Sequence, residues 1–414
     1  MSTLLSNAPP AFHLLVKPAG AKCNLACEYC FYLSKELLYP GSHFRMSSEV
    51  LEAYIKQLLA SQQVPEVCVA WQGGEPTLMG LDFFQRSVEL VKKYKKPGQH
   101  VTYTFQTNGV RLDDRWCAFF KKHDFLIGLS IDGPREFHNA YRVGKGGQGS
   151  FDQVRRGWNL LQKHNVETNI LCAVHAANAT HPLEVYRFFR DDLQARFIQF
   201  IPIVERLSPG GHIQAENERV EPSEGKRPLY MQEGNLVSPR SVKPEQYGLF
   251  LTEVFDEWVH HDVGTVFCQT FDSALASWCH LPASVCISQE TCGLSLVLEH
   301  NGDLYSCDHF VEPDYRLGNI LETPMIELIS STRQLQFGLD KRSRLPACCR
   351  ACDVRFACHG ECPRNRFLKT PDGHEGLNYL CAGYRLFFRH IDEPMRKMAD
   401  LLRRGRAPAE IMQG

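Results

Sequence analysis

The chain has 414 residues, and its 46 Lys and Arg residues nearly balance its 47 Asp and Glu residues. This balance gives no reason to expect nucleic acid or an anionic membrane as a partner. No apolar run approaches the ~20 residues that cross a bilayer, and the start of the chain lacks a secretory signal, so we expect a cytoplasmic protein.

Seventeen cysteines are many for a protein of a reducing compartment. Stable disulfides are rare there, so the number points to metal or redox chemistry. Cys68, Cys117 and Cys172 stand alone in apolar segments and are expected in the core. Nine others fall between residues 286 and 381, which predicts a second site or a pair of sites.

The first predicted strand, Phe12–Val16, leads into a loop that carries Cys23, Cys27 and Cys30 at C-x3-C-x2-C spacing. Thiolates are the usual protein ligands of iron–sulfur clusters. Three thiols leave one iron of a four-iron cubane open to an outside molecule, as a catalytic cluster requires. Zinc in a Cys3His site is the alternative, if a distant histidine joins. The spacing favours iron–sulfur.

Six strand-like runs alternate with helical patterns as far as residue 203. The runs are rich in β-branched and aromatic residues, as buried parallel strands are. Apolar residues between Leu51 and Leu59 recur at helical spacing behind Ser47, a plausible N-cap. Such a series of βα units predicts a parallel α/β architecture, either doubly wound or a full or partial barrel. The predicted strands are Phe12–Val16, Val67–Trp71, Val101–Phe105, Phe125–Ile131, Thr168–Val174 and Phe197–Ile203.

Polar and glycine-rich motifs follow these strands. Gln72–Pro76 (Gln-Gly-Gly-Glu-Pro) follows the second strand, Gln106–Gly109 the third, and Ser130–Pro134 ends the fourth. In a parallel barrel, reactive residues belong on the loops after the strands. Read alone, Gly-Gly-Glu-Pro is an ordinary turn. Its place after a strand and downstream of the cysteine loop favours a ligand site, because adjacent glycines let a backbone approach a ligand closely.

The pattern breaks between residues 205 and 244, where a polar, turn-rich sequence predicts an irregular insertion or linker. A helix is expected over Glu245–His261, and the end-of-helix residues His260 and His261 receive no role. The last segment, Tyr384–Arg406, predicts a basic helix that closes the fold.

Further thiols accompany a predicted hairpin. Leu294–Leu298 and Leu304–Ser306 flank an Asn-Gly turn, so the chain should return Cys307 towards Cys292. Eight cysteines in this region suit two cubane clusters with four ligands each. A pair of zinc ribbons or knuckles is the alternative, since C-x2-C spacing serves zinc equally well.

The cysteine loop, with Tyr29 before its last thiol and an aromatic residue after it, resembles the signature of the radical S-adenosylmethionine (SAM) superfamily. The later thiol spacing resembles its SPASM extension. The resemblance implies that the open iron binds the amine and carboxylate of SAM and that SAM is cleaved to a 5′-deoxyadenosyl radical.

The resemblance also implies an α/β fold, a partial (β/α)6 barrel followed by a small cysteine-rich domain with a β-hairpin and short helices. The domains would be residues 1–204 (barrel), 205–244 (insertion), 245–285 (connecting helices), 286–381 (SPASM domain) and 382–414 (C-terminal helix).

The resemblance further implies a SAM pocket. Gly73 and Gly74 match backbone that binds the SAM amino group, and Arg142 matches a residue that pairs with the carboxylate. Ser130 matches a position that hydrogen-bonds the ribose, and Tyr29 would lie against the adenine. Other residues implied in this pocket are Gln72 and Asn108.

Three [4Fe-4S] clusters are implied. The ligand sets are Cys23, Cys27 and Cys30 for the open cluster; Cys286, Cys292, Cys307 and Cys362 for one auxiliary cluster; and Cys349, Cys352, Cys358 and Cys381 for the other. Fully ligated clusters suit electron transfer. Cys348 is a surplus thiol beside Cys349, whose register is the weakest of the set, and Cys268 and Cys279 are expected to be packing residues.

Longer motifs narrow the resemblance to anaerobic sulfatase-maturating enzymes. They are Cys23–Tyr32, Trp71–Leu78, Gln106–Gly109, Leu129–Pro134 and Tyr305–His309, and the likeness covers nearly the whole chain outside residues 205–244. It implies oxidation of one cysteine or serine of an unmodified sulfatase, in a Cys/Ser-x-Pro-x-Arg motif, to Cα-formylglycine. It also implies an electron donor such as flavodoxin or ferredoxin.

Asp308 matches the catalytic base of that family, a role that requires an ionised carboxylate within reach of the target. Tyr32 would help to line the target pocket. Three alternatives stay open: a SPASM enzyme that makes a thioether or carbon–carbon crosslink, a maturase homologue whose target is not a sulfatase, and a zinc-stabilised binding protein without catalysis.

Overall fold

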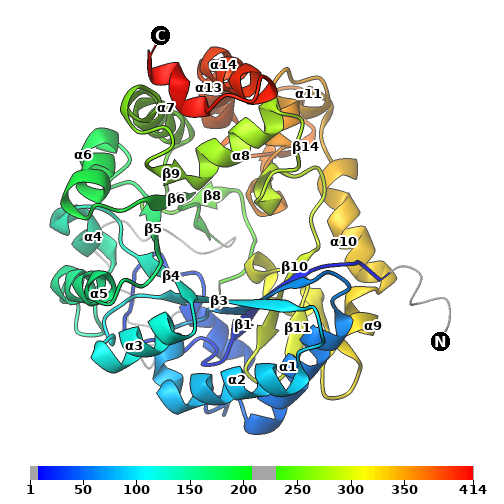
Figure 1. Cartoon of the computed structure of the whole chain (residues 1–414). Helices are drawn as coiled ribbons and strands as arrows, with labels where there is room; N and C mark the ends of the chain where they lie inside the picture. The colour runs from blue at the N-terminus through cyan, green and yellow to red at the C-terminus, as the bar shows by residue number, and fades with distance from the viewer. Residues whose placement is uncertain (1–7, 208–229, 414) are drawn as a thin grey trace.

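A curved, mostly parallel sheet forms the centre of the molecule (Figure 1). The computed structural model describes residues 8–207 and 230–413, and ten strands of this part form one sheet in the order β12-β11-β10-β1-β2-β3-β4-β5-β6-β9. The six strands predicted from the sequence are all present and lie side by side in chain order, and β12 and β9 end the sheet, so the barrel is partial. These strands are β1 (His13–Lys17), β2 (Glu66–Trp71), β3 (His100–Thr107), β4 (Phe125–Ser130), β5 (Thr168–Val174) and β6 (Phe197–Pro202), with the short β9 (Phe267–Cys268) beside β6.

Helices cover the outer, convex side of the sheet (Figure 1). The predicted cap at Ser47 is present, since its side chain accepts a hydrogen bond from the Val50 amide. Aromatic side chains such as Trp71, Phe84 and Phe105 fill the layer between sheet and helices and are at most 1% exposed. The helices are α1 (Ser48–Ser61), α2 (Leu81–Tyr94), α3 (Asp114–Lys122), α4 (Arg135–Tyr141), α5 (Phe151–Lys163) and α6 (Pro182–Arg187).

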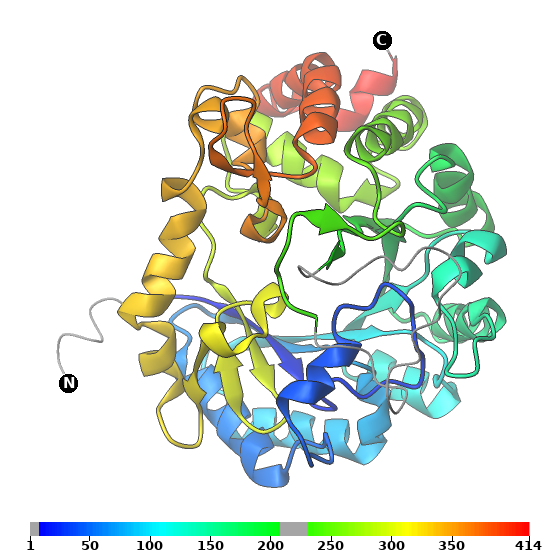
Figure 2. The same ribbon diagram turned by 180° about the vertical axis from the view of Figure 1, so that it is seen from behind.

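The cysteine-rich part is joined to the barrel through the sheet. The predicted hairpin is confirmed as β10 (Ser295–Glu299) and β11 (Asp303–Tyr305), but β10 also pairs in parallel with β1, which places Lys17 opposite Glu299. The rest of this part is made of short elements, seen from behind in Figure 2. They are β12 (Arg316–Asn319), α9 (Met325–Ile329), α10 (Thr332–Ser343), α11 (Ala347–Arg350), α12 (Arg355–Cys358), β13 (Leu368–Lys369) and β14 (Glu375–Leu377).

Helices at the end of the chain close the fold. The predicted helix at Glu245–His261 is present as α7 (Pro244–His261), followed by α8 (Gln269–Trp278). The single helix expected over Tyr384–Arg406 is wrong, because the chain forms α13 (Cys381–His390) and α14 (Asp392–Arg403). Pro394 explains the break, since it cannot donate a backbone hydrogen bond to His390 but is tolerated in the first turn of a new helix.

Of the insertion predicted at residues 205–244, residues 208–229 lie outside the described residues. The described remainder contains a small antiparallel pair, β7 (Arg206–Leu207) and β8 (Leu236–Val237). No helix in the described part of the chain has the length and apolar character needed to cross a membrane.

Candidate active site

The three-cysteine loop leaves β1 and is fixed by backbone hydrogen bonds. The amides of Ala26 and Glu28 donate to the carbonyls of Val143 and Tyr141, each at 2.8 Å. Burial, and then the charge of Glu75, raises the pKa of the Cys23 thiol to about 12, with smaller contributions from Cys30 and Cys27. The three sulfurs therefore share one small region, and cluster binding there would displace protons from thiols that otherwise hold them.

The Gly-Gly-Glu-Pro loop packs directly on the segment that connects β1 to this cysteine loop. The Gly74 amide donates to the Gly20 carbonyl at 2.9 Å, and the Glu75 amide donates to the Lys22 carbonyl at 2.8 Å. A Cβ on Gly74 would stand 2.0 Å from the Lys22 carbonyl oxygen, and Gly73 has φ of +139°. Both positions therefore require glycine.

Substitution of Gly74 by alanine should destabilise the protein, because rigid backbone blocks the new methyl group. We expect a loss of roughly 1–3 kcal/mol in the free energy of unfolding, with a lower Tm and less iron retained. Gly146→Ala is the control, since its Cβ would meet only the flexible end of Gln148. Equal thermal unfolding midpoints of the two variants and the parent would contradict this packing argument.

Glu75 links the loop after β2 to the loop after β3. It was not singled out from the sequence. It is fully buried and accepts hydrogen bonds from the hydroxyls of Thr77 and Thr107 at 2.7 and 2.8 Å. The Asn108 amide donates to its second oxygen at 2.9 Å. Asn108 in turn directs its side-chain nitrogen to Cys23 Sγ at 3.6 Å and Asn24 Oδ1 at 2.9 Å. A glutamate between two glycines and a proline was the available signal.

Tyr29 and Arg142 meet at a buried carboxylate. Asp132 accepts a hydrogen bond from the Tyr29 hydroxyl at 2.5 Å and pairs with Arg142 Nε at 2.8 Å. His175 Nε2 lies 3.6 Å from the same carboxylate, and its ring packs 5.7 Å from that of Tyr29. Burial opposes ionisation of Asp132, but Arg142 and His175 hold its pKa far below the usual range. These interacting side chains hold the cysteine loop against the end of β4.

The other predicted pocket residues lie at the ends of β4 and β2, on either side of β3. Ser130 ends β4 and accepts a hydrogen bond from Gln106 at 3.0 Å. Gln72 follows β2 and accepts from Lys17 Nζ at 2.9 Å. The roles assigned to these residues towards SAM stay predictions.

Lys17 was missed in the sequence and occupies the centre of the site. It ends β1, its side chain is 2% exposed, and its Nζ lies 2.5 Å from Asp308 Oδ1. The ammonium also stands over the Tyr32 ring, 4.3 Å from its centroid. A lysine that ends a buried strand at the loop edge of a barrel was the signal, since buried lysines are rare without a partner.

Asp308 is poised as a carboxylate. Burial alone would raise its pKa, but the charges of Lys17, His309 and Arg364 together lower it below the usual value. Its side chain is 15% exposed.

On the other side of Lys17, Tyr32 donates a hydrogen bond to Glu299, which contacts His300 at 3.1 Å. His300 reaches Ser42 Oγ at 2.7 Å. A polar chain thus runs away from the Lys17–Asp308 pair.

Two groups of thiols gather in the C-terminal part. Burial raises the pKa of the Cys307 and Cys292 thiols, that of Cys292 to about 11. Cys362 and Cys286 add to the rise for Cys307, and Cys286 adds to it for Cys292. Lys341, itself 0% exposed, holds this group through hydrogen bonds to the carbonyls of Cys286 and Ile287 at 2.5 and 2.9 Å. The four sulfurs predicted for one auxiliary cluster therefore lie near one another.

The second thiol group lies near α11 to α13. Burial raises the pKa of the Cys358 and Cys381 thiols. Cys381 and Cys349 add to the rise for Cys358, and Cys352 adds to it for Cys381. Cys348 is exposed and also interacts with Cys349, so the register there stays a prediction. No three His, Cys, Asp or Glu side chains in residues 8–207 and 230–413 converge closely enough to hold one metal ion. Thiol-only sets of this size fit iron–sulfur clusters.

Comparison with known proteins agrees with this geometry. Residues 18–189 match the family model of the radical SAM superfamily, and residues 290–353 match that of an iron–sulfur cluster-binding domain, SPASM. A serine-type anaerobic sulfatase-maturating enzyme of Bacteroides thetaiotaomicron is 47% identical over 97% of this chain and 94% of its own length. The chain belongs to the anaerobic sulfatase-maturating enzymes.

The likeness to this family extends to its second type and to a solved structure. A cysteine-type anaerobic sulfatase-maturating enzyme of Clostridium perfringens is 34% identical over 92% of this chain and 96% of its own length. The structure of native anSMEcpe with bound AdoMet (SAM) and a Cp18Cys peptide superposes with a TM-score of 0.80 at 33% identity, covering 94% of this chain and 99% of that one. The radical SAM fold followed by a SPASM domain is therefore confirmed for this anaerobic sulfatase-maturating enzyme.

Proposed function

We propose that this protein oxidises one serine or cysteine side chain of an unmodified sulfatase to Cα-formylglycine, with SAM as co-substrate. The relatives named as serine-type and cysteine-type sulfatase-maturating enzymes support this assignment. The observation that carries it is the buried Lys17–Asp308 pair beside Cys307. The pair supplies an ionised base next to a set of thiols that fits an iron–sulfur cluster, at the loop end of a radical SAM barrel.

Three [4Fe-4S] clusters complete the proposed enzyme. Cys23, Cys27 and Cys30 would hold the open cluster, and the two four-thiol groups described above would hold the others. When bound, these groups and SAM supply the 5′-deoxyadenosyl radical and an electron acceptor. The residues predicted for SAM, from Tyr29 to Arg142, lie on loops that the Glu75 and Asp132 networks fix in place.

The chemistry assigns a proton and an electron to separate places. The target Cβ loses one hydrogen atom to the radical, and the target hydroxyl or thiol gives its proton to Asp308. One electron then leaves to the acceptor, which yields an aldehyde from serine or a thioaldehyde from cysteine. Hydrolysis of the thioaldehyde replaces sulfur by oxygen. Asp308 serves as the base because Lys17 keeps its carboxylate ionised and Tyr32 bounds the same space.

Further parts of the proposal concern the surroundings of the site. The sulfatase is recognised at a Cys/Ser-x-Pro-x-Arg motif, and a flavodoxin or ferredoxin supplies the electron that SAM cleavage consumes. The domain division predicted from the sequence and a cytoplasmic location belong to the same proposal.

A peptide assay tests the function as a whole. Anaerobic protein with SAM and dithionite should convert a serine peptide with this motif to a product lighter by two hydrogens, and a cysteine peptide to the same aldehyde. Mass spectrometry of the peptide and chromatography of 5′-deoxyadenosine measure the two products. A peptide with alanine at the target position is the control. A crosslinked peptide, or no peptide product while SAM is cleaved, would overturn the proposed function.

A further inference from the structure

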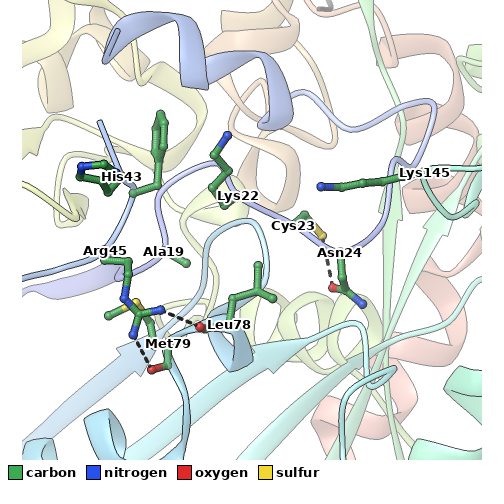
Figure 3. A pocket seen from close by; sticks show the side chains of 10 residues that line it. Ala19, Lys22, Cys23, Asn24, His43, Arg45, Leu78, Met79 and Lys145 are labelled. Atoms are coloured by element: carbon green, nitrogen blue, oxygen red, sulfur yellow. Dashed lines mark hydrogen bonds between the residues drawn. The ribbon is translucent and has the colours of Figure 1, made fainter. Parts of the chain in front are cut away.

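A cationic cavity opens beside the first cysteine of the cluster loop (Figure 3). It has a volume of about 560 Å³, and Lys22, His43, Arg45 and Lys145 line it together with Cys23. The described residues that line it include no Asp or Glu. The four basic side chains come from three separate stretches of chain and surround the same opening.

Two of these basic groups are held in place. Arg45 donates to the carbonyls of Leu78 and Met79, each at 3.0 Å. Lys22 lies over the Phe44 ring, 5.0 Å from its centroid, and contacts Glu36 at 3.1 Å, while its side chain is 49% exposed. Lys145 is exposed. The positive charges of Lys22 and Lys145 are therefore accessible from solvent.

The cavity is distinct from the predicted SAM pocket, and Cys23 lies between the two. Its sulfur contacts Asn108 on the pocket side, yet Cys23 and Asn24 also line the cavity. Gly73, Gly74, Ser130 and Arg142, which are assigned to SAM, do not line it. The cavity thus brings solvent-exposed positive charge close to the thiol loop from outside.

We propose that this cavity and its basic rim form the docking surface for a small acidic protein that carries a one-electron cofactor. The inference rests on the proposed function, because SAM cleavage consumes one electron before the substrate has released any. The donor gives up one electron and the cluster site gains it, with no bond or proton exchanged. Electron-transfer encounters use small, transient interfaces, and opposite charges raise their association rate.

The placement favours a protein donor at this surface. Electron transfer requires a short path, and Cys23 is both a predicted ligand and a wall of the cavity. Basic side chains around a concave entrance concentrate an acidic partner there.

The test compares two reductants in two matched double variants. Lys22→Gln/Lys145→Glu removes charge from the rim, and Lys56→Gln/Lys121→Glu makes the same charge change on α1 and α3, at residues that are also exposed. With reduced flavodoxin as the probe, formylglycine formation by the rim variant at low salt and subsaturating flavodoxin should fall about 10-fold, and calorimetric binding of flavodoxin should weaken by a similar factor. With dithionite, the rim variant should stay within about twofold of the parent.

Each outcome decides the inference. A loss that shrinks at high salt and is absent from the control pair supports it, since exposed charge attraction is screened. Equal flavodoxin dependence of both double variants, equal losses with flavodoxin and dithionite, or no flavodoxin binding to the parent would overturn it. Failure of the dithionite reaction in the parent would instead count against the proposed function, and the binding measurement would still decide the docking surface.

Discussion

Asp308→Asn should bind its clusters and cleave SAM, but form formylglycine about 10²–10⁴-fold more slowly than the parent. The amide keeps the shape of the carboxylate and cannot accept the target proton. Hydrogen-atom removal from the substrate does not require that base, so 5′-deoxyadenosine should continue to appear. The ratio of 5′-deoxyadenosine to aldehyde, measured in the same reaction, should therefore rise steeply.

Asp314→Asn provides a matched control six residues along the chain. Asp314 is exposed, and the substitution makes the same charge change. Iron content and electronic absorption of both variants establish that the clusters are loaded. If Asp308→Asn makes aldehyde at the parental rate, another group accepts the proton, and the proposed role of the Lys17–Asp308 pair fails.

The barrel could be predicted from the sequence because each strand has a local signature. β2 to β6 are short β-branched or aromatic runs, and each predicted motif follows the end of a strand where parallel topology collects loops. Iron–sulfur binding could also be predicted from the number and spacing of the thiols, and the match to an iron–sulfur cluster-binding domain agrees, while the division of the thiols into ligand sets stays a prediction. Here local pattern and global architecture agree.

Pairings between strands and side chains that are far apart in the chain could not be predicted from the sequence. The parallel pairing of β10 with β1 joins residues about 280 positions apart, and a hairpin signal describes only the contact between β10 and β11. That pairing puts Glu299 beside Lys17. Asp132, His138 and His175 are fully buried polar residues that come together beside Arg142. Asp132 pairs with Arg142, its amide donates to the His138 ring, and His175 Nε2 lies 3.6 Å from its carboxylate, an arrangement that no spacing rule indicates.

Lys17 shows the same limit at the reaction centre, because its importance depends on a partner 291 positions away, Asp308. Removing its charge should change the pH dependence of the reaction. In the parent, Lys17, His309 and Arg364 hold the pKa of Asp308 below its usual value, so the base is ionised throughout the neutral range. In Lys17→Met, burial is opposed mainly by Arg364, because burial lowers the pKa of His309 to about 4 and leaves its ring neutral in this pH range. The pKa of Asp308 should then rise, because a buried carboxylate that loses its counter-charge takes up a proton.

We therefore expect formylglycine formation by Lys17→Met to fall roughly 10–100-fold at pH 6.5 and to recover partly at pH 8.5, a smaller loss than removal of the base itself, whose contribution is about 10²–10⁴-fold. The parent should lack this acid-side loss between the two pH values. Lys17→Arg should restore most of the rate at pH 6.5, since it returns the charge, and Lys56→Met serves as an exposed control. Aldehyde yield and 5′-deoxyadenosine are followed together, because a loss of both would indicate damage to the SAM site. A pH-independent loss in Lys17→Met, unrelieved by arginine, would show that Lys17 acts by packing and that Asp308 stays ionised without it.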